Sequence, residues 1–262
     1  MLRCCAISLA IACVSLKAAN AEPLDFKPIS SFDTIAVHIT PSTPYEARYL
    51  VQWHGVNAGE STHRLTNEGS GVFHLESRTE PYFRLLPFRY YEHASFLLEA
   101  NNLTPLQYEY TKKEGKKSVA GNLLFDQKNE TIHPAQTAET EESIWSLKLS
   151  PDIFDKLTHT VKMRQDLIAG KTTLSYQVVE DGHVSTMDFH VSEKKSMHTA
   201  LGTVNAVVLE HQSARRRTLF YLAEDYGYLL LQLEQFRDEK PSGGGKILSL
   251  SLMDASLEKS HS

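Results

Sequence analysis

Asp188 and His190 are the residues of this sequence best placed for acid–base chemistry. They lie two positions apart in a strand-like segment, His183 to Val191. Because alternate residues of a strand point to one face, the carboxylate can orient the imidazole there. Hydrolysis also needs a nucleophile, and the sequence contains no G-x-S-x-G turn to supply it. Ser192 and Lys195 match S-x-x-K but follow a strand, whereas acylases place that motif on a helix. We assign no catalytic residue and keep a hydrolase centred on Asp188 and His190 as the alternative.

Twelve histidines raise the question of a metal site, and His183, His190 and His198 form the closest group. The separation between His183 and His190 is odd, which places their side chains on opposite faces of a regular strand. The helical H-E-x-x-H pair typical of many zinc enzymes does not occur in the sequence. We therefore predict no bound metal and no cofactor.

A segment rich in aromatic residues runs from Pro81 to Tyr91. Its prolines, Pro81 and Pro87, limit how far a regular strand extends through it. Aromatic side chains either pack in the core of a β protein or line a groove for an apolar ligand. On the second interpretation, the candidates for ligand contact are Tyr82, Phe83, Phe88 and Tyr90.

Arg215, Arg216 and Arg217 form a compact basic cluster between two strand-like segments. One interpretation is a solvated hairpin turn, which the net charge of −5 favours because the overall field is negative. The other is contact with an anionic lipid headgroup or a lipopolysaccharide phosphate. Arg216 is the basic candidate for a ligand site.

These candidates belong to a sequence whose pattern is mostly β. From Tyr45 onward, short segments of alternating apolar and polar residues recur, separated by turn residues such as Gly55 to Gly59 and Asp181 and Gly182. We expect antiparallel strands in one strongly curved sheet, either barrel-like or a β-roll.

One amphipathic helix is expected at about residues 150–169. Ser150 can cap its first turn, Pro151 suits the first helical position, and Gly170 can end it. Residues at helical spacing along it are Ile153, Phe154, Leu157, Val161, Arg164 and Ile168.

Residues 1–21 have the features of a cleavable secretory leader. Arg3 supplies positive charge, an apolar run extends from Cys4 to Leu16, and small residues precede a cleavage site after Ala21. The run is shorter than the roughly 20 apolar residues of a membrane-spanning helix. We therefore expect a periplasmic protein without a transmembrane anchor. The alternative is a lipoprotein anchored through Cys13.

The composition argues against a nucleic-acid partner and against stabilisation by disulfides. All three cysteines lie in the leader, so no disulfide is expected after cleavage. The leader removes Arg3 and Lys17 and no acidic residue, which makes the mature chain more acidic than the whole. Because nucleic-acid binding depends on Lys and Arg neutralising phosphates, we expect no nucleic-acid partner.

Several short motifs follow one another in a characteristic order. They begin with Tyr49 to Glu60, a strand, a turn and a pair of glycines, and the most specific are Thr199 to Val207 and Phe220 to Asp225. Between them come Leu103 to Tyr108, Leu124 to Asp126 and the helix from Asp152 to Arg164. In this order they resemble the bacterial envelope family known as domain of unknown function 3108, over roughly residues 45–252. The resemblance implies export and a β fold, and it carries over no catalytic residue.

The expected organisation has four parts. Residues 1–21 are the leader, 22–44 an irregular N-terminal arm, 45–256 a single β domain and 257–262 a flexible C-terminal tail. Export, a β architecture and the aromatic segment together favour a non-enzymatic periplasmic binding or envelope-maintenance protein. Its curved sheet would hold an apolar or lipid-like molecule beneath the aromatic segment.

Overall fold

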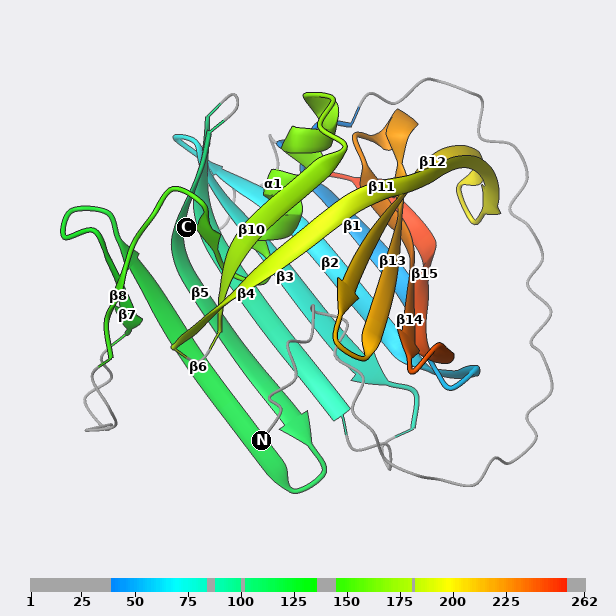
Figure 1. Ribbon diagram of the computed structural model, residues 1–262, viewed down its shortest axis with the longest axis horizontal. Coiled ribbons are helices and arrows are strands. Elements are labelled where there is room, and N and C mark those ends of the chain that lie inside the picture. Colours follow the sequence, from blue (N-terminus) through cyan, green and yellow to red (C-terminus); the bar gives the residue numbers. More distant parts are fainter. Residues whose placement is uncertain (1–38, 84–87, 100–101, 136–144, 181, 254–262) are drawn as a thin grey trace.

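The computed structural model describes residues 39–83, 88–99, 102–135, 145–180 and 182–253 (Figure 1). The predicted leader, most of the arm and the tail lie outside these ranges. Within them a single 15-stranded sheet accounts for most of the chain.

The strands fall into two groups in chain order. The N-terminal wing consists of β1 (Tyr45–Trp53), β2 (Val56–Gly69), β3 (Val72–Pro81), β4 (Phe88–Glu99), β5 (Asn102–Glu114), β6 (Lys117–Asp126), β7 (Thr131–Pro134) and β8 (Leu147–Lys148). The C-terminal wing consists of β9 (Ile153–Phe154), β10 (Thr173–Glu180), β11 (His183–Thr199), β12 (Gly202–Ser213), β13 (Arg216–Ala223), β14 (Leu229–Arg237) and β15 (Lys240–Leu252). The helix α1 (Thr158–Ile168) lies between β9 and β10 in the sequence, and the 3-10 helix η1 (Glu224–Tyr226) lies between β13 and β14.

Strand order follows directly from a chain of hairpins. It runs β8-β7-β6-β5-β4-β3-β2-β1-β15-β14-β13-β12-β11-β10-β9, and every neighbouring pair is antiparallel except β9 and β10. The wings join where β1 pairs with β15, with Tyr45 opposite Leu252. The sheet ends at β8 on one side and at β9 on the other, so it curves strongly without closing. The predicted mostly β, barrel-like fold is confirmed.

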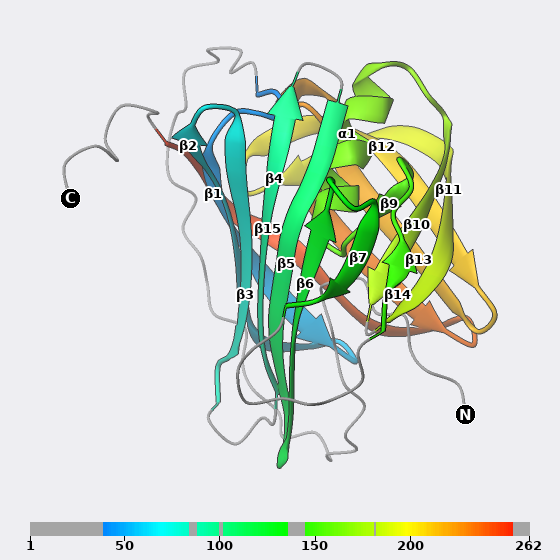
Figure 2. The same ribbon diagram turned by 90° about the vertical axis from the view of Figure 1, so that its left-hand side faces the viewer.

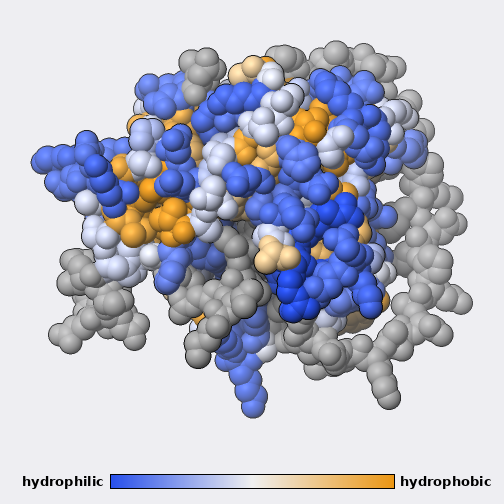
Figure 3. All heavy atoms as spheres, in the orientation of Figure 1, coloured by the Kyte–Doolittle hydropathy of each residue, from blue (hydrophilic) through white to orange (hydrophobic). Residues whose placement is uncertain are grey.

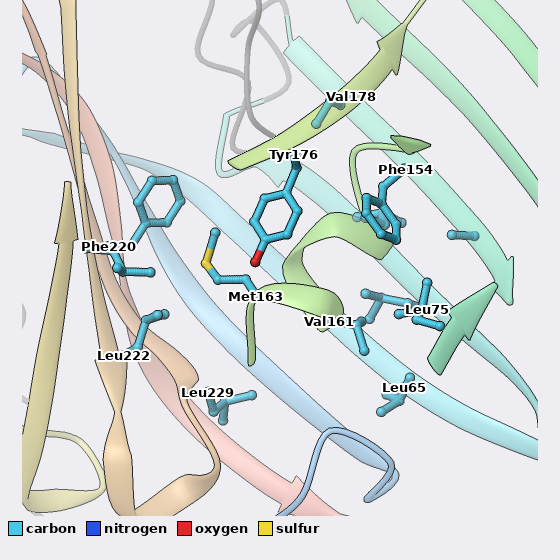
Figure 4. Packing of buried hydrophobic residues seen from close by; sticks show 14 of the residues in the cluster. Leu65, Leu75, Phe154, Val161, Met163, Tyr176, Val178, Phe220, Leu222 and Leu229 are labelled. Carbon is cyan, nitrogen blue, oxygen red and sulfur yellow. The ribbon is translucent and has the colours of Figure 1, made fainter. Parts of the chain in front are cut away.

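Helix α1 fills the space that the curved sheet encloses. Figures 1 and 2 show it between the two wings, with β10 and β11 on one side and β2 to β5 on the other. In Figure 4, Val161 of α1 faces Leu65 and Leu75 of the N-terminal wing, and Met163 points toward Phe220 of the C-terminal wing. The helix therefore links the two halves of one continuous apolar core.

The core forms because every second residue along a strand is buried. In β4 every second residue from Phe88 to Leu98 is buried, because successive side chains of a strand point to opposite faces. The alternation predicted from Tyr45 to Val51 is also confirmed, with Tyr45, Ala47, Tyr49 and Val51 all buried. Each large apolar side chain contributes about 1.5–3 kcal/mol when fully buried, so the core is stable without cross-links.

The helix begins later than the sequence pattern predicts. Ile153 and Phe154 pair with Gln177 and Val178 as the short strand β9, so α1 starts at Thr158. Ser150 does not cap it, because the N-cap position is Leu157; Asp155, two residues earlier, accepts from the backbone N–H of Thr158 through Oδ1 at 2.9 Å. The predicted end is confirmed, since Gly170 follows α1 with a φ of +82°. No helix in the described ranges is long and apolar enough to cross a bilayer.

Strand β15 includes Pro241 and three consecutive glycines near its start at Lys240. These residue types normally indicate a loop, so the sequence pattern does not predict this part of the strand. A side chain at Gly244 would place its Cβ 2.4 Å from the backbone oxygen of Leu233. The glycine allows β14 and β15 to approach one another closely.

Candidate functional site

Five turns lie side by side along one edge of the sheet, and we call them the lower rim. They connect β12 to β13, β14 to β15, β1 to β2, β3 to β4 and β5 to β6. The lower rim consists of the described residues of these turns, which for β3–β4 are Tyr82 and Phe83, and the strand residues next to each turn. These described residues lie in the lower half of both Figure 1 and Figure 2.

The four predicted aromatic residues meet at this rim but divide into two kinds. Phe88 and Tyr90 are buried, with their rings stacked at a centroid distance of 6.1 Å. Together with Ala58 and the partly buried Trp53 they form a small apolar cluster separate from the main core. Tyr82 and Phe83 precede these residues and are 46% and 63% exposed. Packing in the core therefore applies to Phe88 and Tyr90, and ligand contact at Tyr82 and Phe83 stays a prediction.

Tyr82 is fixed in position despite its exposure. Its backbone N–H donates to the oxygen of Ala58 at 3.0 Å, and its hydroxyl donates to Oε1 of Glu60 at 3.1 Å. Glu60 is also paired with Arg48. Partial burial and the hydrogen bond to Glu60 raise the pKa of Tyr82 to about 12, so the phenol stays a neutral donor. Val56 in the adjacent turn adds a further exposed apolar side chain, at 53%.

Arg216, the fifth predicted residue, lies on the same rim, but two other turns separate it from the turn that carries Tyr82 and Phe83. It begins β13 and is opposite Arg237 of β14. Its neighbour Arg215 donates from Nε to Oδ1 of Asp238 at 2.7 Å, and the guanidinium of Arg217 stacks 4.5 Å from the ring centre of Phe236. The basic cluster is therefore a surface hairpin held against the next one.

A second unusual group of residues lies inside the sheet. Lys112 of β5 and Lys156, which precedes α1, both bind Oε1 of Glu180 at the end of β10. Nearby, Tyr108 donates to Oε1 of Glu92 at 2.6 Å. We call these five residues the interior charge cluster. Because Lys112 and Glu180 belong to different wings, the cluster joins the wings at the side where the sheet does not close.

Burial governs ionisation in the interior charge cluster. It raises the pKa of Glu92, although the charge of Lys156 opposes this effect. It also lowers the pKa of Lys156, against the attraction of Glu180. For Glu180, burial would raise the pKa, but the charges of Lys156 and Lys112 outweigh it and lower the pKa. Each charged group has an oppositely charged neighbour within the molecule.

Sequence reasoning missed this cluster, although β4 contained a signal. Glu92 occupies an inward position between Tyr90 and Ala94 in an otherwise apolar alternation. A carboxylate at such a position indicates a buried partner, because an unpaired buried charge is strongly unfavourable. The partners, Tyr108 and the lysines, come from segments distant in the sequence.

Arg164 is a further buried charge, and it stands among the apolar positions of the predicted helix. Its Nε donates to the oxygen of Gly227 at 2.8 Å, and one terminal nitrogen donates to the oxygen of Thr40 at 3.0 Å. Its guanidinium also lies 5.7 Å from the ring centre of Tyr45. The side chain thus ties α1 to the turn after β13 and to the segment before β1.

The residues of the hydrolase alternative share one exposed strand face, as the spacing predicts. Asp188 accepts a hydrogen bond from the hydroxyl of Ser175 at 2.7 Å, and its backbone oxygen lies 2.8 Å from Nδ1 of His211. Among the described residues, no hydrogen bond joins Asp188 to His190. Ser175, rather than His190, is the residue that contacts the Asp188 carboxylate. The hydrolase centred on Asp188 and His190 stays a prediction.

Histidines meet at a different place from the group considered in the sequence. His183, His190 and His198 are spread along β11. On the outer face of the N-terminal wing, His74 Nδ1 lies 3.2 Å from His93 Nε2, and His93 Nδ1 lies 3.1 Å from Oε1 of Glu109. In the part of the chain that the structure describes, no three His, Cys, Asp or Glu side chains are grouped as a metal site requires.

Comparison with known proteins places the chain in a family. No curated protein matches it. The crystal structure of the beta-barrel-like protein of domain of unknown function DUF1849 from Brucella abortus has a similar fold, with a TM-score of 0.53 and 13% identity. That match covers 83% of this chain and 100% of the other. The family model described as protein of unknown function (DUF3108) matches residues 48–239. The chain therefore belongs to the DUF3108 family.

Proposed function

We propose that this chain is an exported periplasmic binding protein that recognises the apolar part of an amphipathic, lipid-like molecule. The contact surface is the centre of the lower rim, where Val56, Tyr82 and Phe83 are exposed. The observation that carries the proposal is the exposure of two neighbouring aromatic side chains above a separate, small apolar cluster. Aromatic residues supply large contact areas and dominate binding energies, so their exposure indicates a partner.

Packing inside the sheet supports the rim rather than the interior as the place of contact. Helix α1 and both wings form one continuous set of buried apolar side chains. Within the interior charge cluster, Lys112 and Lys156 are paired with Glu180, and Glu92 accepts a hydrogen bond from Tyr108. The exposed pair at the rim is different, because Phe83 offers its ring to the outside of the molecule.

A fluorescent fatty acid such as cis-parinaric acid tests the proposal. Titration of the purified protein should give saturable binding, and Phe83→Ser should weaken it about tenfold, since burying a phenylalanine is worth about 1.5–3 kcal/mol. Ile168→Ser is the matched control, because Ile168 is also exposed but lies at the end of α1. Absence of saturable binding, or equal losses in the two variants, would refute the proposed function.

Export has its own test. In the native host, the protein from the periplasmic fraction should have the intact mass of a chain that begins at Glu22, which corresponds to cleavage after Ala21. An acylated chain that begins at Cys13, recovered with membranes, would instead support the lipoprotein alternative. A cytoplasmic protein of full length would contradict both.

A further inference from the structure

Charged residues are divided unevenly between the lower rim and the described turns at the opposite strand ends. The lower rim carries the basic residues Arg89, Lys113, Lys116, Lys117, Arg215, Arg216, Arg217, Arg237 and Lys240, together with the acidic residues Glu80, Glu114, Asp238 and Glu239. The β10–β11 hairpin, at the same edge of the sheet but outside the lower rim, adds Glu180. The described turns at the opposite strand ends carry the acidic residues Glu68, Glu99, Asp126, Glu130, Glu224 and Asp225, together with Lys128. The protein therefore has a basic end, although its net charge is −5.

Basic residues flank the exposed aromatic residues on both sides of the rim. Toward the N-terminal wing, the β3–β4 turn adjoins the β5–β6 hairpin, since Phe88 pairs with Glu114. That hairpin carries the three lysines and projects as a hydrophilic tip at the lower edge of Figure 3. Toward the C-terminal wing, the β1–β2 turn adjoins the β14–β15 hairpin, since the N–H of His54 donates to the oxygen of Ser242. The arginine hairpin follows, because the N–H of Asp238 donates to the oxygen of Arg215.

We infer that the lower rim docks onto the surface of an anionic phospholipid bilayer. The lysine and arginine hairpins contact lipid phosphates, and Val56, Tyr82 and Phe83 enter the interface between headgroups and acyl chains. Aromatic residues favour this region of a bilayer, and clustered basic residues are attracted to its negative surface. The inference rests on the proposed function for its apolar centre, and it identifies the partner as a membrane rather than a single molecule.

The span of the rim is what favours a bilayer. Strands are spaced about 4.8 Å apart, so the β12–β13 and β5–β6 turns are roughly 40 Å apart along the curved edge of the sheet. A single amphiphile bound at Phe83 does not extend to both basic flanks. A surface with many phosphates meets all of them simultaneously.

Vesicle co-sedimentation tests the inference with the purified protein. Vesicles of phosphatidylcholine containing about 30% phosphatidylglycerol should bind it at about 50 mM NaCl and release most of it at about 500 mM, because salt screens exposed charges. Lys116→Gln with Lys117→Gln should lower the partition coefficient roughly 30-fold, since each lysine near the surface is worth about 1 kcal/mol. Lys128→Gln with Lys148→Gln is the matched control, since these lysines are exposed at the opposite strand ends, and it should change little.

The other possible outcomes distinguish a failure of this inference from a failure of the proposed function. Saturable fatty-acid binding that depends on Phe83, without vesicle binding at low salt, overturns the bilayer inference and supports the proposed function. Vesicle binding that depends on the two lysines but not on Phe83 or Val56 supports the docking surface and contradicts the apolar contact. Equal binding to pure phosphatidylcholine overturns the role of the basic flanks. A dimer in light scattering that Phe83→Ser abolishes identifies a second copy as the occupant and overturns the inference.

Discussion

The interior charge cluster and the lower rim each reverse the usual distribution of residues. The interior buries Glu92 and Lys156, whereas the rim exposes Tyr82 and Phe83. Charged residues are almost never fully buried unless they have partners, and here Lys156 is paired with Glu180 while Glu92 accepts a hydrogen bond from Tyr108. Among the residues that the structure describes, none gives the exposed aromatic pair a comparable explanation.

This difference indicates which region is structural and which is functional. Interactions inside the cluster join the two wings where the sheet lacks hydrogen bonds between β8 and β9. Removing them should therefore affect folding. The rim residues contribute little to the core, and their removal should affect binding. The following predictions separate these two effects, beginning with the largest.

Glu180→Gln should produce the largest loss of stability, about 3 kcal/mol in the free energy of unfolding. The change leaves Lys112 and Lys156 without their shared carboxylate in a largely buried place, and breaking a buried ion pair on one side is strongly destabilising. Urea unfolding measures it. Glu193→Gln is the control, since Glu193 is exposed and its ion pair with Lys195 contributes at most about 0.5 kcal/mol. Similar losses of unfolding free energy in both variants would contradict a structural role for the interior charge cluster.

Two arginine variants test the same difference between the interior of the sheet and the lower rim. Arg164→Met should reduce stability by about 2 kcal/mol, because the backbone oxygens of Gly227 and Thr40 lose a buried donor. Arg215→Met at the lower rim should cost much less stability than Arg164→Met, because its ion pair with Asp238 is exposed. Thermal or urea unfolding of the two variants measures the difference, and equal losses would contradict it.

Stability should fall as the pH decreases from about 6.5 to about 4, because of a buried histidine. Burial lowers the pKa of His159 to about 4, with the charges of His211 and Lys156 adding to the effect. The unfolded chain binds a proton to this residue below about 6.5, while the folded chain does so only below about 4. His159→Gln should make the decrease smaller by about 2 kcal/mol in urea unfolding across this range.

Two other groups affect the same pH range. Burial also lowers the pKa of His63 to about 4, which adds to the loss of stability. Burial raises the pKa of Asp155 to about 6, so the folded state takes up this proton first and Asp155 favours folding as the pH falls. The contribution of His159 is isolated by comparing how steeply the free energy of unfolding changes with pH in the two proteins, rather than by comparing their stability at one pH. An unchanged slope in His159→Gln, with His190→Gln as an exposed control, would contradict the assignment.

Phe83→Ser should have the smallest effect on folding, within about 0.5 kcal/mol, because the ring is mostly exposed. The same variant is expected to lose about tenfold in fatty-acid affinity. Stability and affinity should therefore change independently at the rim. A loss of stability similar to that of Glu180→Gln would show that Phe83 belongs to the folded core.

Much of the fold was predictable because alternating burial is a local property. Strand β1, the curved antiparallel sheet and the end of the helix at Gly170 all follow from residues close in sequence. The start of α1 was not predictable, because Ile153 and Phe154 pair with β10, which comes later in the chain. The glycines of β15 likewise form a strand by pairing with β1 and β14, which lie elsewhere in the sequence or bring Leu233 close to Gly244.

The candidate site was predictable in part for the same reason. The aromatic composition pointed to Tyr82, Phe83, Phe88 and Tyr90, but only the tertiary packing against Ala58 separates the buried pair from the exposed pair. Pairing between Lys112, Lys156 and Glu180 depends on the curvature of the whole sheet. The spacing of these residues in the sequence does not predict this pairing.

Hydrogen–deuterium exchange with and without anionic vesicles tests the central claim most directly, because it compares both regions in one experiment. The account predicts slower exchange in peptides that contain Val56 and Phe83, with unchanged exchange in α1 and β10. Slower exchange in α1 and β10, with an unchanged rim, would contradict it and place the binding surface inside the sheet.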